Sequence, residues 1–144
     1  TFRCINRHKD EGCVRATALA AGSKFYASGS NDGVVNLYKR SDCMPGGSRP
    51  NPTPLKAVMS LTTRVDSLRF SHDENLLLMS STMKKDSLKI LHVPSRRVFS
   101  NWPTSQTPLR HVTSVDFTAN SGMMAIGNDR GRVLLYSVGQ YSSA

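Results

Sequence analysis

The sequence predicts an all-β fold assembled from the four-stranded sheets of a β-propeller. One layout of residues occurs three times along the 144-residue chain, and in each copy short apolar segments alternate with polar turns. No window of a dozen residues shows the i, i+3, i+4, i+7 spacing of apolar side chains that a long helix requires. Four short strands in roughly 45 residues is the spacing of one propeller blade. We therefore expect about three four-stranded blades.

The repeat lies in three segments: Val14–Tyr38, Val65–His92 and Val112–Tyr136. When their opening valines are aligned, a large apolar residue stands five positions later in each segment: Leu19, Phe70 and Phe117. Each segment closes on a ring-bearing side chain: Tyr38, His92 and Tyr136. Self-similarity of this kind is the sequence signature of a repeat architecture.

The first three strands of each unit follow from local patterns. In the first strand, residues two apart such as Val115 and Phe117 share one face. After a polar turn, a short apolar run predicts the second strand: Tyr26–Ser28, Leu76–Met79 and Met123–Ile126. Residues that suit a pleated, half-buried surface predict the third strand: Val34–Tyr38, Leu88–His92 and Arg132–Val138.

Tight turns join the second and third strands. The first unit has Asn31-Asp32-Gly33, and the third has Asn128–Gly131, which contains Asp129. Asp-Gly is favoured in hairpins because glycine takes a positive φ without a Cβ penalty. The second unit is expected to carry three extra residues in this hairpin, at Thr82–Asp86.

Fourth strands between the units, at Lys56–Leu61 and Arg97–Trp102, complete the blades. The blade units then span about 14–61, 65–102 and 112–138, and Thr1–Asn6 is predicted to be the outer strand of a preceding blade. Propellers close with four to eight blades, and three blades would leave open strand edges. We therefore expect residues 1–144 to be the C-terminal part of a longer propeller, or to pair with another chain.

The stretch Ser41–Pro54 departs from the repeat because it carries four of the seven prolines and two glycines. Proline cannot donate a hydrogen bond to a strand ladder, so the stretch is predicted to be a surface loop inserted between strands three and four. Such a loop is either merely tolerated or a docking site for a partner.

The chain is basic, with 19 lysines and arginines, 10 acidic residues and a formal net charge of +9. This charge either keeps the domain in solution or suits an environment rich in RNA or DNA. Six cations are candidates for contact with phosphate or with a partner: Lys84, Lys85, Arg96, Arg97, Arg130 and Arg132. The longest apolar runs have four residues, so no membrane span is expected.

Neither an enzyme nor a metal site is predicted. Cys4, Cys13 and Cys43 lack the close pairing of zinc ligands and the dense, even set of a disulfide framework. Reduced, intracellular thiols are expected instead. The four histidines occupy non-equivalent places in the repeats, and no Ser/His/Asp or Cys/His constellation can be assembled. We therefore expect no catalysis, no cofactor and no small-molecule substrate.

The blade layout resembles WD40 repeats, in which the fourth strand of one sequence repeat completes the preceding blade. The Trp-Asp that usually ends the third strand is replaced: Leu37-Tyr38, Leu91-His92 and Leu135-Tyr136 stand there. Asp32 and Asp129 lie in the turn where WD40 proteins usually have an aspartate. The resemblance therefore implies a partial version of the hydrogen-bond network that often rigidifies such blades.

Particular strings go beyond generic WD40 spacing: Asp10-Glu11-Gly12, Gly33-Val34-Val35-Asn36-Leu37-Tyr38, Val98-Phe99-Ser100-Asn101-Trp102-Pro103 and His111-Val112. Of these, Phe99-Ser100-Asn101 before Trp102-Pro103 and His111-Val112 before the last blade are not required by a blade. With them the chain resembles the U3 small nucleolar RNA-associated protein 18 family of WD40 proteins. The resemblance implies a non-catalytic scaffold of the nucleolus, in the nucleus, that works with other WD40 proteins of the UtpB subcomplex of the small-subunit processome. Such scaffolds support assembly of the U3 ribonucleoprotein on pre-rRNA and maturation of 18S rRNA. Two alternatives are a propeller that binds RNA phosphates directly, and an unrelated WD40 adaptor in the cytoplasm.

Overall fold

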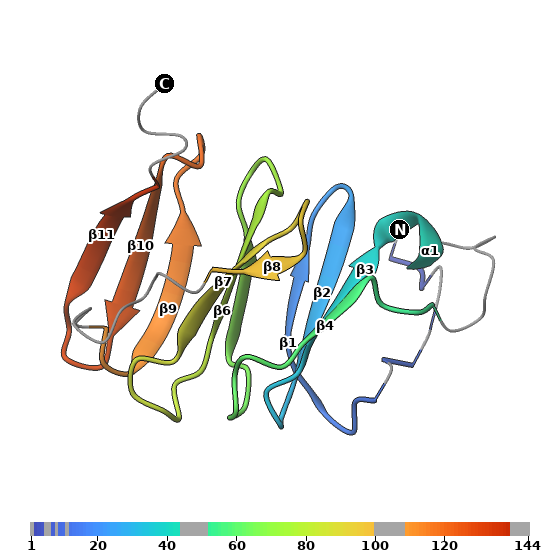
Figure 1. Ribbon diagram of the computed structural model, residues 1–144, viewed down its shortest axis with the longest axis horizontal. Coiled ribbons are helices and arrows are strands. Elements are labelled where there is room, and N and C mark those ends of the chain that lie inside the picture. Colours follow the sequence, from blue (N-terminus) through green and yellow to red (C-terminus); the bar gives the residue numbers. More distant parts are fainter. Residues whose placement is uncertain are drawn as a thin grey trace.

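The protein is seen in a computed structural model that describes residues 2–4, 7, 9–10, 12–43, 52–99 and 109–138. Within these residues, three antiparallel sheets and one short helix form (Figure 1). The strands are β1 (Ala16–Ala21), β2 (Phe25–Ser30), β3 (Val35–Lys39) and β4 (Lys56–Val58) in the first sheet; β5 (Ser67–Phe70), β6 (Leu76–Ser80), β7 (Leu88–His92) and β8 (Arg97–Val98) in the second; β9 (Val112–Phe117), β10 (Met123–Asn128) and β11 (Val133–Ser137) in the third. Each sheet is a meander of consecutive strands, which confirms the predicted all-β class.

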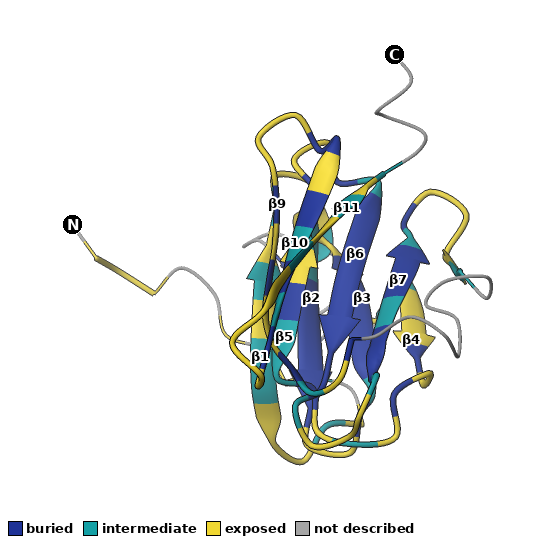
Figure 2. Ribbon diagram, turned by 90° about the vertical axis from the view of Figure 1, so that its left-hand side faces the viewer, coloured by how far each residue is buried: buried dark blue, intermediate teal, exposed yellow. Residues whose placement is uncertain are grey.

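The sheets stack face to face, and a hydrophobic cluster fills each of the two interfaces. Leu37 of the first sheet packs with Leu77 and Leu91 of the second. On the other side of the second sheet, Leu78 packs with Ile126 of the third. Figure 2 shows buried strands in the middle, with β1, β5 and β9 together along one side and β4 on the other. Each interface thus has its own hydrophobic cluster, and the second sheet lies between the two.

The second sheet is buried on both faces, which explains the uninterrupted apolar run of β6. Leu77 and Met79 belong to the cluster shared with the first sheet. Leu76 and Leu78 belong to the cluster shared with the third sheet. Because alternate residues of a strand point to opposite faces, a strand covered on both sides needs apolar residues at every position.

The pairing register shows that Leu19 does not share the position of Phe70 and Phe117, as the alignment predicted. Each phenylalanine forms the last strand pair before the turn of its own hairpin, with a residue of the second strand. In the first sheet, the residue in that last pair is Ala21. The turn at 22–25 is two residues shorter than the corresponding turns of the other two sheets. Alignment on the opening valines therefore displaces β1 by two positions.

His92 lies one position beyond the place of Tyr38 and Tyr136, which corrects a second predicted equivalence. Tyr38 pairs with Tyr26, and Tyr136 pairs with Met124. The residue of β6 at the same position is Leu77, and its partner is Leu91. The connection at 81–87 is two residues longer than the other two hairpins rather than three. Because the connection has two extra residues and not three, His92 follows the position of the tyrosines by one residue.

The fourth strands are shorter than predicted. β4 ends at Val58, three residues before the expected end of the strand at Lys56–Leu61. β8 ends at Val98, and residues 100–102 of the predicted strand at Arg97–Trp102 lie outside the described residues. In the third sheet, the described residues form three strands.

A short helix, α1 (Arg40–Cys43), begins where the sequence predicts the loop at Ser41–Pro54. Residues 52–54 of that loop have no regular structure, and residues 44–51 lie outside the described residues. At the predicted outer strand, residues 2–4 form no strand. Residues 1, 5 and 6 lie outside the described residues.

The first sheet leaves an apolar residue uncovered. In register, Leu19 corresponds to Leu68 of the second sheet and Val115 of the third. Leu68 and Val115 face the preceding sheet and are 6% and 8% exposed, whereas Leu19 is 77% exposed. In the described part of the chain, no sheet precedes β1, so the position that is buried in the other two units is open here.

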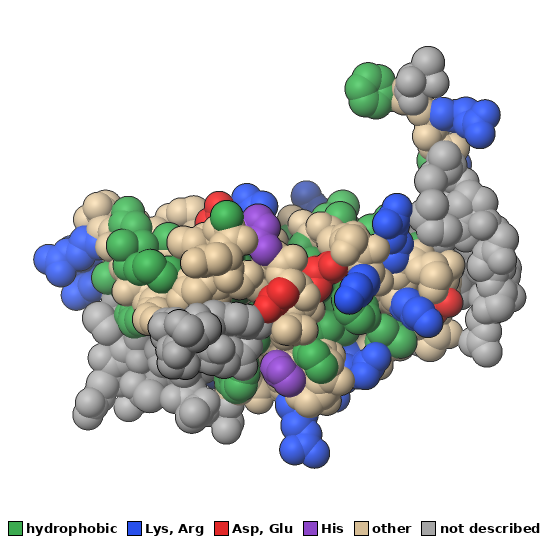
Figure 3. All heavy atoms as spheres, turned by 90° about the horizontal axis from the view of Figure 1, so that it is seen from above, with side chains coloured by type: hydrophobic (Ala, Val, Ile, Leu, Met, Phe, Trp, Pro, Cys, Tyr) green, Lys and Arg blue, Asp and Glu red, His purple; other side chains and the backbone are tan. Residues whose placement is uncertain are grey.

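The third sheet leaves its opposite face uncovered. Val133 and Leu135 correspond in register to Val35 and Leu37, which are fully buried between the first two sheets. In β11 the same positions are 69% and 63% exposed. Figure 3 shows hydrophobic side chains gathered at the end of the molecule that the third sheet forms. The middle sheet thus has neighbours on both faces, and the outer sheets have one each.

Candidate interaction surfaces

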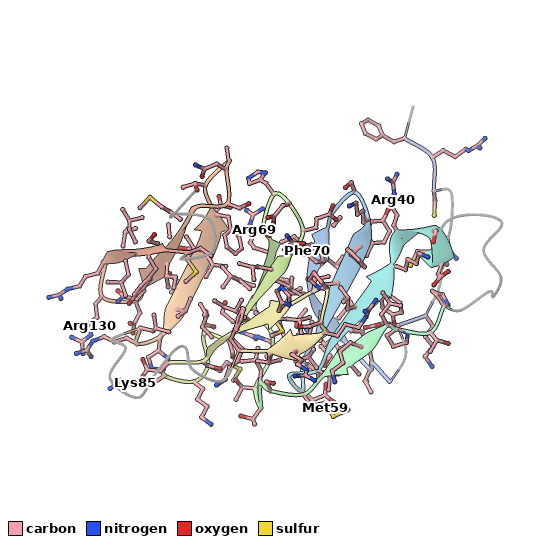
Figure 4. All side chains as sticks on the ribbon, turned by 45° about the horizontal axis from the view of Figure 1, so that its top comes forward. Arg40, Met59, Arg69, Phe70, Lys85 and Arg130 are labelled. Atoms are coloured by element: carbon pink, nitrogen blue, oxygen red, sulfur yellow. The ribbon has the colours of Figure 1, made fainter. Side chains whose placement is uncertain are left out.

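Four of the six predicted contact residues lie on two neighbouring turns. Lys84 and Lys85 lie in the turn between β6 and β7, and Arg130 and Arg132 lie in the connection between β10 and β11. All four are exposed. Figure 4 shows Lys85 and Arg130 on the same rim of the molecule. The stacking of the sheets therefore brings together cations that are more than forty residues apart in the sequence.

Residues 110 and 111, just before β9, connect these two turns. Asp86 N donates to the carbonyl of Arg110 at 2.9 Å, and Arg110 N donates to Asp86 Oδ1 at 2.8 Å. His111 Nδ1 hydrogen-bonds to the carbonyl of Thr82 at 2.9 Å, and Asp129 N donates to the carbonyl of His111 at 3.0 Å. Arg110 is exposed at this junction. We call this surface the basic rim: Lys84, Lys85, Arg110, Arg130 and Arg132.

The basic rim carries an excess of positive charge. Five cations stand beside two carboxylates, Asp86 and Asp129. The ion pairs among the described residues are Arg64–Asp66 and Arg69–Asp116, and neither involves the rim. An uncompensated basic surface attracts polyanions. Sequence reasoning missed Arg110 because it lies between repeat units, where no periodic pattern marks it.

Arg96 and Arg97 lie on a different surface, beside a groove between β4 and β8. The groove has a volume of about 500 Å³ and is lined by residues 56–60 and 96–98. Because β4 and β8 are the last strands of their sheets, the groove runs between two sheet edges. We call it the edge groove, and its long exposed side chains are Lys56, Met59, Arg96 and Arg97. The six predicted cations therefore divide between two separate surfaces.

A second hollow, of about 770 Å³, is bordered by the first strands β1, β5 and β9. Arg69 Nε lies 3.9 Å from Asp116 Oδ1 there. Asp66 accepts hydrogen bonds from Arg64 at 2.8 Å and from Thr82 N at 2.7 Å. Burial raises the pKa of Asp66, but these hydrogen bonds have the larger combined effect and bring the pKa below its ordinary value of 3.8. Arg69 and Asp116 are thus the ion pair between residues that line this hollow, and Asp66 pairs with Arg64 beside it.

The two turn aspartates have different roles. Ser30 Oγ donates to the Asp32 carboxylate and so tightens the turn of the first sheet. In the third sheet the amide of Asn128 has that role, because its Oδ1 accepts from the backbone N of Arg130 at 3.0 Å. Relative to the turn glycine, Asp129 stands one position earlier than Asp32. The aspartate of this turn is therefore not equivalent in the two units.

Asp10 anchors the segment before β1, a role that sequence reasoning missed. Its carboxylate accepts hydrogen bonds from Ser28 Oγ at 2.8 Å, from Asn36 Nδ2 at 2.9 Å and from the Tyr38 hydroxyl. Burial raises the pKa of Asp10, but these hydrogen bonds have the larger combined effect and bring the pKa below its ordinary value of 3.8. The three donors lie on the same face of the first sheet as Leu19, which fixes the segment against that face.

Metal ligands do not gather anywhere in the described ranges: no group of three or more His, Cys, Asp or Glu side chains lies close enough to hold an ion. Cys4, Cys13 and Cys43, all of them described, form no disulfide. In the same ranges, no helix is long and apolar enough to span a membrane. The candidate sites that remain are the basic rim and the edge groove.

Curated relatives resemble the chain over nearly its whole length. It is 41% identical over 146 residues to the U3 small nucleolar RNA-associated protein 18 homolog of Arabidopsis thaliana. It is 40% identical over 154 residues to U3 small nucleolar RNA-associated protein 18 of Saccharomyces cerevisiae, and 38% identical over 143 residues to the homolog of Homo sapiens. No protein-family model matches the chain.

These alignments cover 100%, 95% and 97% of this chain, but 26%, 25% and 25% of the relatives. The chain therefore spans about a quarter of the length of the curated relatives it matches. The resemblance that the sequence strings indicate is confirmed over that quarter.

Proposed function

We propose that this chain, which is related to one quarter of U3 small nucleolar RNA-associated protein 18, is part of a WD40-type propeller that acts in ribosome biogenesis. It is a non-catalytic scaffold of the small-subunit processome and works in the nucleolus, in the nucleus, with other WD40 proteins of the UtpB subcomplex. There it supports assembly of the U3 ribonucleoprotein on pre-rRNA and maturation of 18S rRNA. The observation that carries the proposal is 38–41% identity to proteins named for their association with U3 small nucleolar RNA.

The propeller itself is supported by the two uncovered faces of the stack. Leu19 at one end, and Val133 and Leu135 at the other, occupy positions that are buried wherever a neighbouring sheet exists. Burial of such side chains between sheets stabilises each of them by about 1.5–3 kcal/mol. The relatives are about four times as long as the chain, which is enough polypeptide for further sheets on both sides. We infer that units of the same repeat cover both faces in the longer polypeptide.

A scaffold role agrees with the surfaces of the described residues. The basic rim and the edge groove are exposed, carry cations without carboxylate partners among the described residues, and lie on different parts of the stack. Separate surfaces allow one rigid body to hold more than one partner at a time. The stacked sheets supply that rigidity through their shared hydrophobic clusters.

The scaffold proposal is tested by affinity purification of the full-length protein from nuclear extract at moderate salt, with and without nuclease treatment. We expect the other WD40 proteins of the processome to be recovered after the RNA has been digested, because a scaffold holds them by protein contacts. If neither these proteins nor U3 RNA is recovered without nuclease, the proposed function is wrong.

A second candidate function is direct binding of RNA phosphates, and the basic rim is the observation that favours it. Phosphate contacts release counterions, so affinity falls with salt by about 0.7 log units per decade for each contact with single-stranded RNA. Replacing Lys84 and Lys85 by glutamine should therefore lower the slope by about 1.4 if both lysines contact phosphate. The matched control replaces Arg96 and Arg97 by glutamine. If the variant at Lys84 and Lys85 keeps the slope of the unaltered protein, these two lysines do not contact RNA phosphates.

A further inference from the structure

We propose that the edge groove between β4 and β8 binds an extended, acidic segment of a partner protein. The inference deepens the proposed scaffold function, because it assigns one of the surfaces of the scaffold to one class of partner. Three exposed cations, Lys56, Arg96 and Arg97, line the groove together with Met59. No carboxylate lies among the lining residues.

The charge of the edge groove is not balanced from within the chain. The nine described acidic residues lie elsewhere, and Asp10, Asp66, Glu74 and Asp86 are each held by hydrogen bonds in other parts of the stack. Among the residues outside the described ranges, Glu11 is the single acidic side chain. The 144 residues thus leave these three cations open to a complementary acidic segment, and complementarity of this kind guides the choice of partner.

The shape and the apolar content of the groove favour a protein segment over RNA. Met59 is 71% exposed, and Figure 4 shows it projecting beyond β4. Methionine adapts its shape to apolar partner side chains, whereas the lining holds no aromatic ring on which a base could stack. The last strands of two sheets form the walls, and exposed strand edges are surfaces to which extended segments add.

The test uses the full-length protein and a defined probe, a fluorescein-labelled peptide of alternating glutamate and valine. Such a peptide is acidic, extended and apolar at alternate positions. A peptide of alternating lysine and valine is the control for charge. We expect fluorescence anisotropy to detect binding of the acidic peptide alone, and this binding should weaken as the salt concentration rises.

Two pairs of matched variants locate the site. Replacing Arg96 and Arg97 by glutamate should weaken binding at least tenfold, whereas the same change at Arg130 and Arg132 on the basic rim should weaken it less than twofold. Met59→Ser should weaken binding about threefold without a change of charge. Its control is Met83→Ser, because Met83 is also a largely exposed methionine, 61% accessible, and lies outside the groove, between β6 and β7.

Three results would overturn the inference. Equal losses in the two charge-reversal variants would show general attraction to a basic protein rather than a site. A uridine oligonucleotide that displaces the peptide, and itself loses affinity through the groove substitutions, would assign the groove to RNA. Failure of the acidic peptide to bind at all would leave the groove without the proposed ligand. None of these results depends on recovery of processome proteins, so the scaffold proposal is judged separately.

Discussion

Glu74 and Ser121 occupy the same place in consecutive sheets, and each accepts hydrogen bonds from a turn of the sheet before it. Both lie in the turn after the first strand of their sheet, with φ of 59° and 60°. Glu74 Oε1 accepts from the backbone N of Lys24 at 2.9 Å and of Phe25 at 3.3 Å. Ser121 Oγ accepts from the backbone N of His72 at 2.9 Å. One repeat position thus holds neighbouring sheets together.

Removing the Glu74 carboxylate is expected to weaken the junction between the first two sheets. In Glu74→Ala, the backbone N–H groups of Lys24 and Phe25 lose their acceptor, and the free energy of unfolding should fall by about 2–3 kcal/mol. Ser121→Ala removes one acceptor at the next junction and should cost about 1 kcal/mol. Urea unfolding of both variants measures the difference. Equal losses in the free energy of unfolding would contradict the larger contribution expected from Glu74.

Acid is expected to destabilise the protein through the same residue. Burial opposes ionisation of Glu74, but hydrogen bonds from Ser23, Lys24 and Phe25 outweigh it and hold its pKa below the ordinary value of 4.5. A carboxyl whose pKa is lower in the folded than in the unfolded state stabilises the fold at pH values above its unfolded-state pKa. That contribution is lost as the pH falls through the folded pKa. The free energy of unfolding should therefore decrease as the pH drops below about 4.5.

The substitution Glu74→Gln isolates this contribution, because the amide keeps an acceptor oxygen and loses the charge. Urea unfolding measured between pH 7 and pH 3 should show a shallower loss of stability in the variant than in the unaltered protein. Asp129→Asn, a change in an exposed turn, is the control. A pH dependence that Glu74→Gln leaves unchanged would assign the acid sensitivity to other carboxyls.

Two turn glycines are expected to differ in their tolerance of alanine. Gly33 and Gly131 both have positive φ, 91° and 75°, so alanine at either position is strained by about 1–2 kcal/mol. A Cβ on Gly33 would also lie 2.5 Å from the carbonyl oxygen of Leu61 and 2.8 Å from that of Thr63. Among the described residues, apart from its two chain neighbours, none has an atom within 4 Å of a Cβ on Gly131.

Gly33→Ala should therefore lower the free energy of unfolding by about 1–3 kcal/mol more than Gly131→Ala, because backbone atoms must move to admit the methyl group. The difference in urea midpoint between the two variants measures this. A larger loss for Gly131→Ala would contradict the positions of Leu61 and Thr63 against the turn.

Leu135 is expected to be buried in the longer polypeptide. If a further sheet covers β11, Leu135→Ser in the full-length protein should lower the free energy of unfolding by about 2–5 kcal/mol, as removal of a core side chain does. Leu37→Ser, at the equivalent buried position, is the control that should be damaging in any case. A neutral Leu135→Ser beside a damaging Leu37→Ser would mean that the face of the third sheet stays open.

The class of the fold and most strands could be predicted from the sequence, because alternation and turn residues are local signals. β7 has the predicted bounds, Leu88–His92, and β2 and β10 lie where the apolar runs indicate. The register could not be predicted, because it depends on how many residues each turn takes up. A first-sheet turn shorter by two residues was enough to place Leu19 against the wrong partners.

The candidate sites depended still more on the stacking of the sheets. The sequence predicts one set of six contact cations: Lys84, Lys85, Arg96, Arg97, Arg130 and Arg132. The structure divides them, because the turns at 82–86 and 128–131 meet through Arg110 and His111. Arg96 and Arg97 instead meet Lys56 and Met59 across two sheet edges.

The repeat of short antiparallel strands can be predicted from local patterns, since a period of two residues and a glycine in a tight turn act over a few positions. Which faces are buried, which carboxylates hold neighbouring sheets and which cations share a surface depends instead on how the sheets pack. Those properties arise from contacts such as Glu74 with Lys24, fifty residues apart. Contacts at that distance form only when one sheet packs against the next, and no local pattern records them.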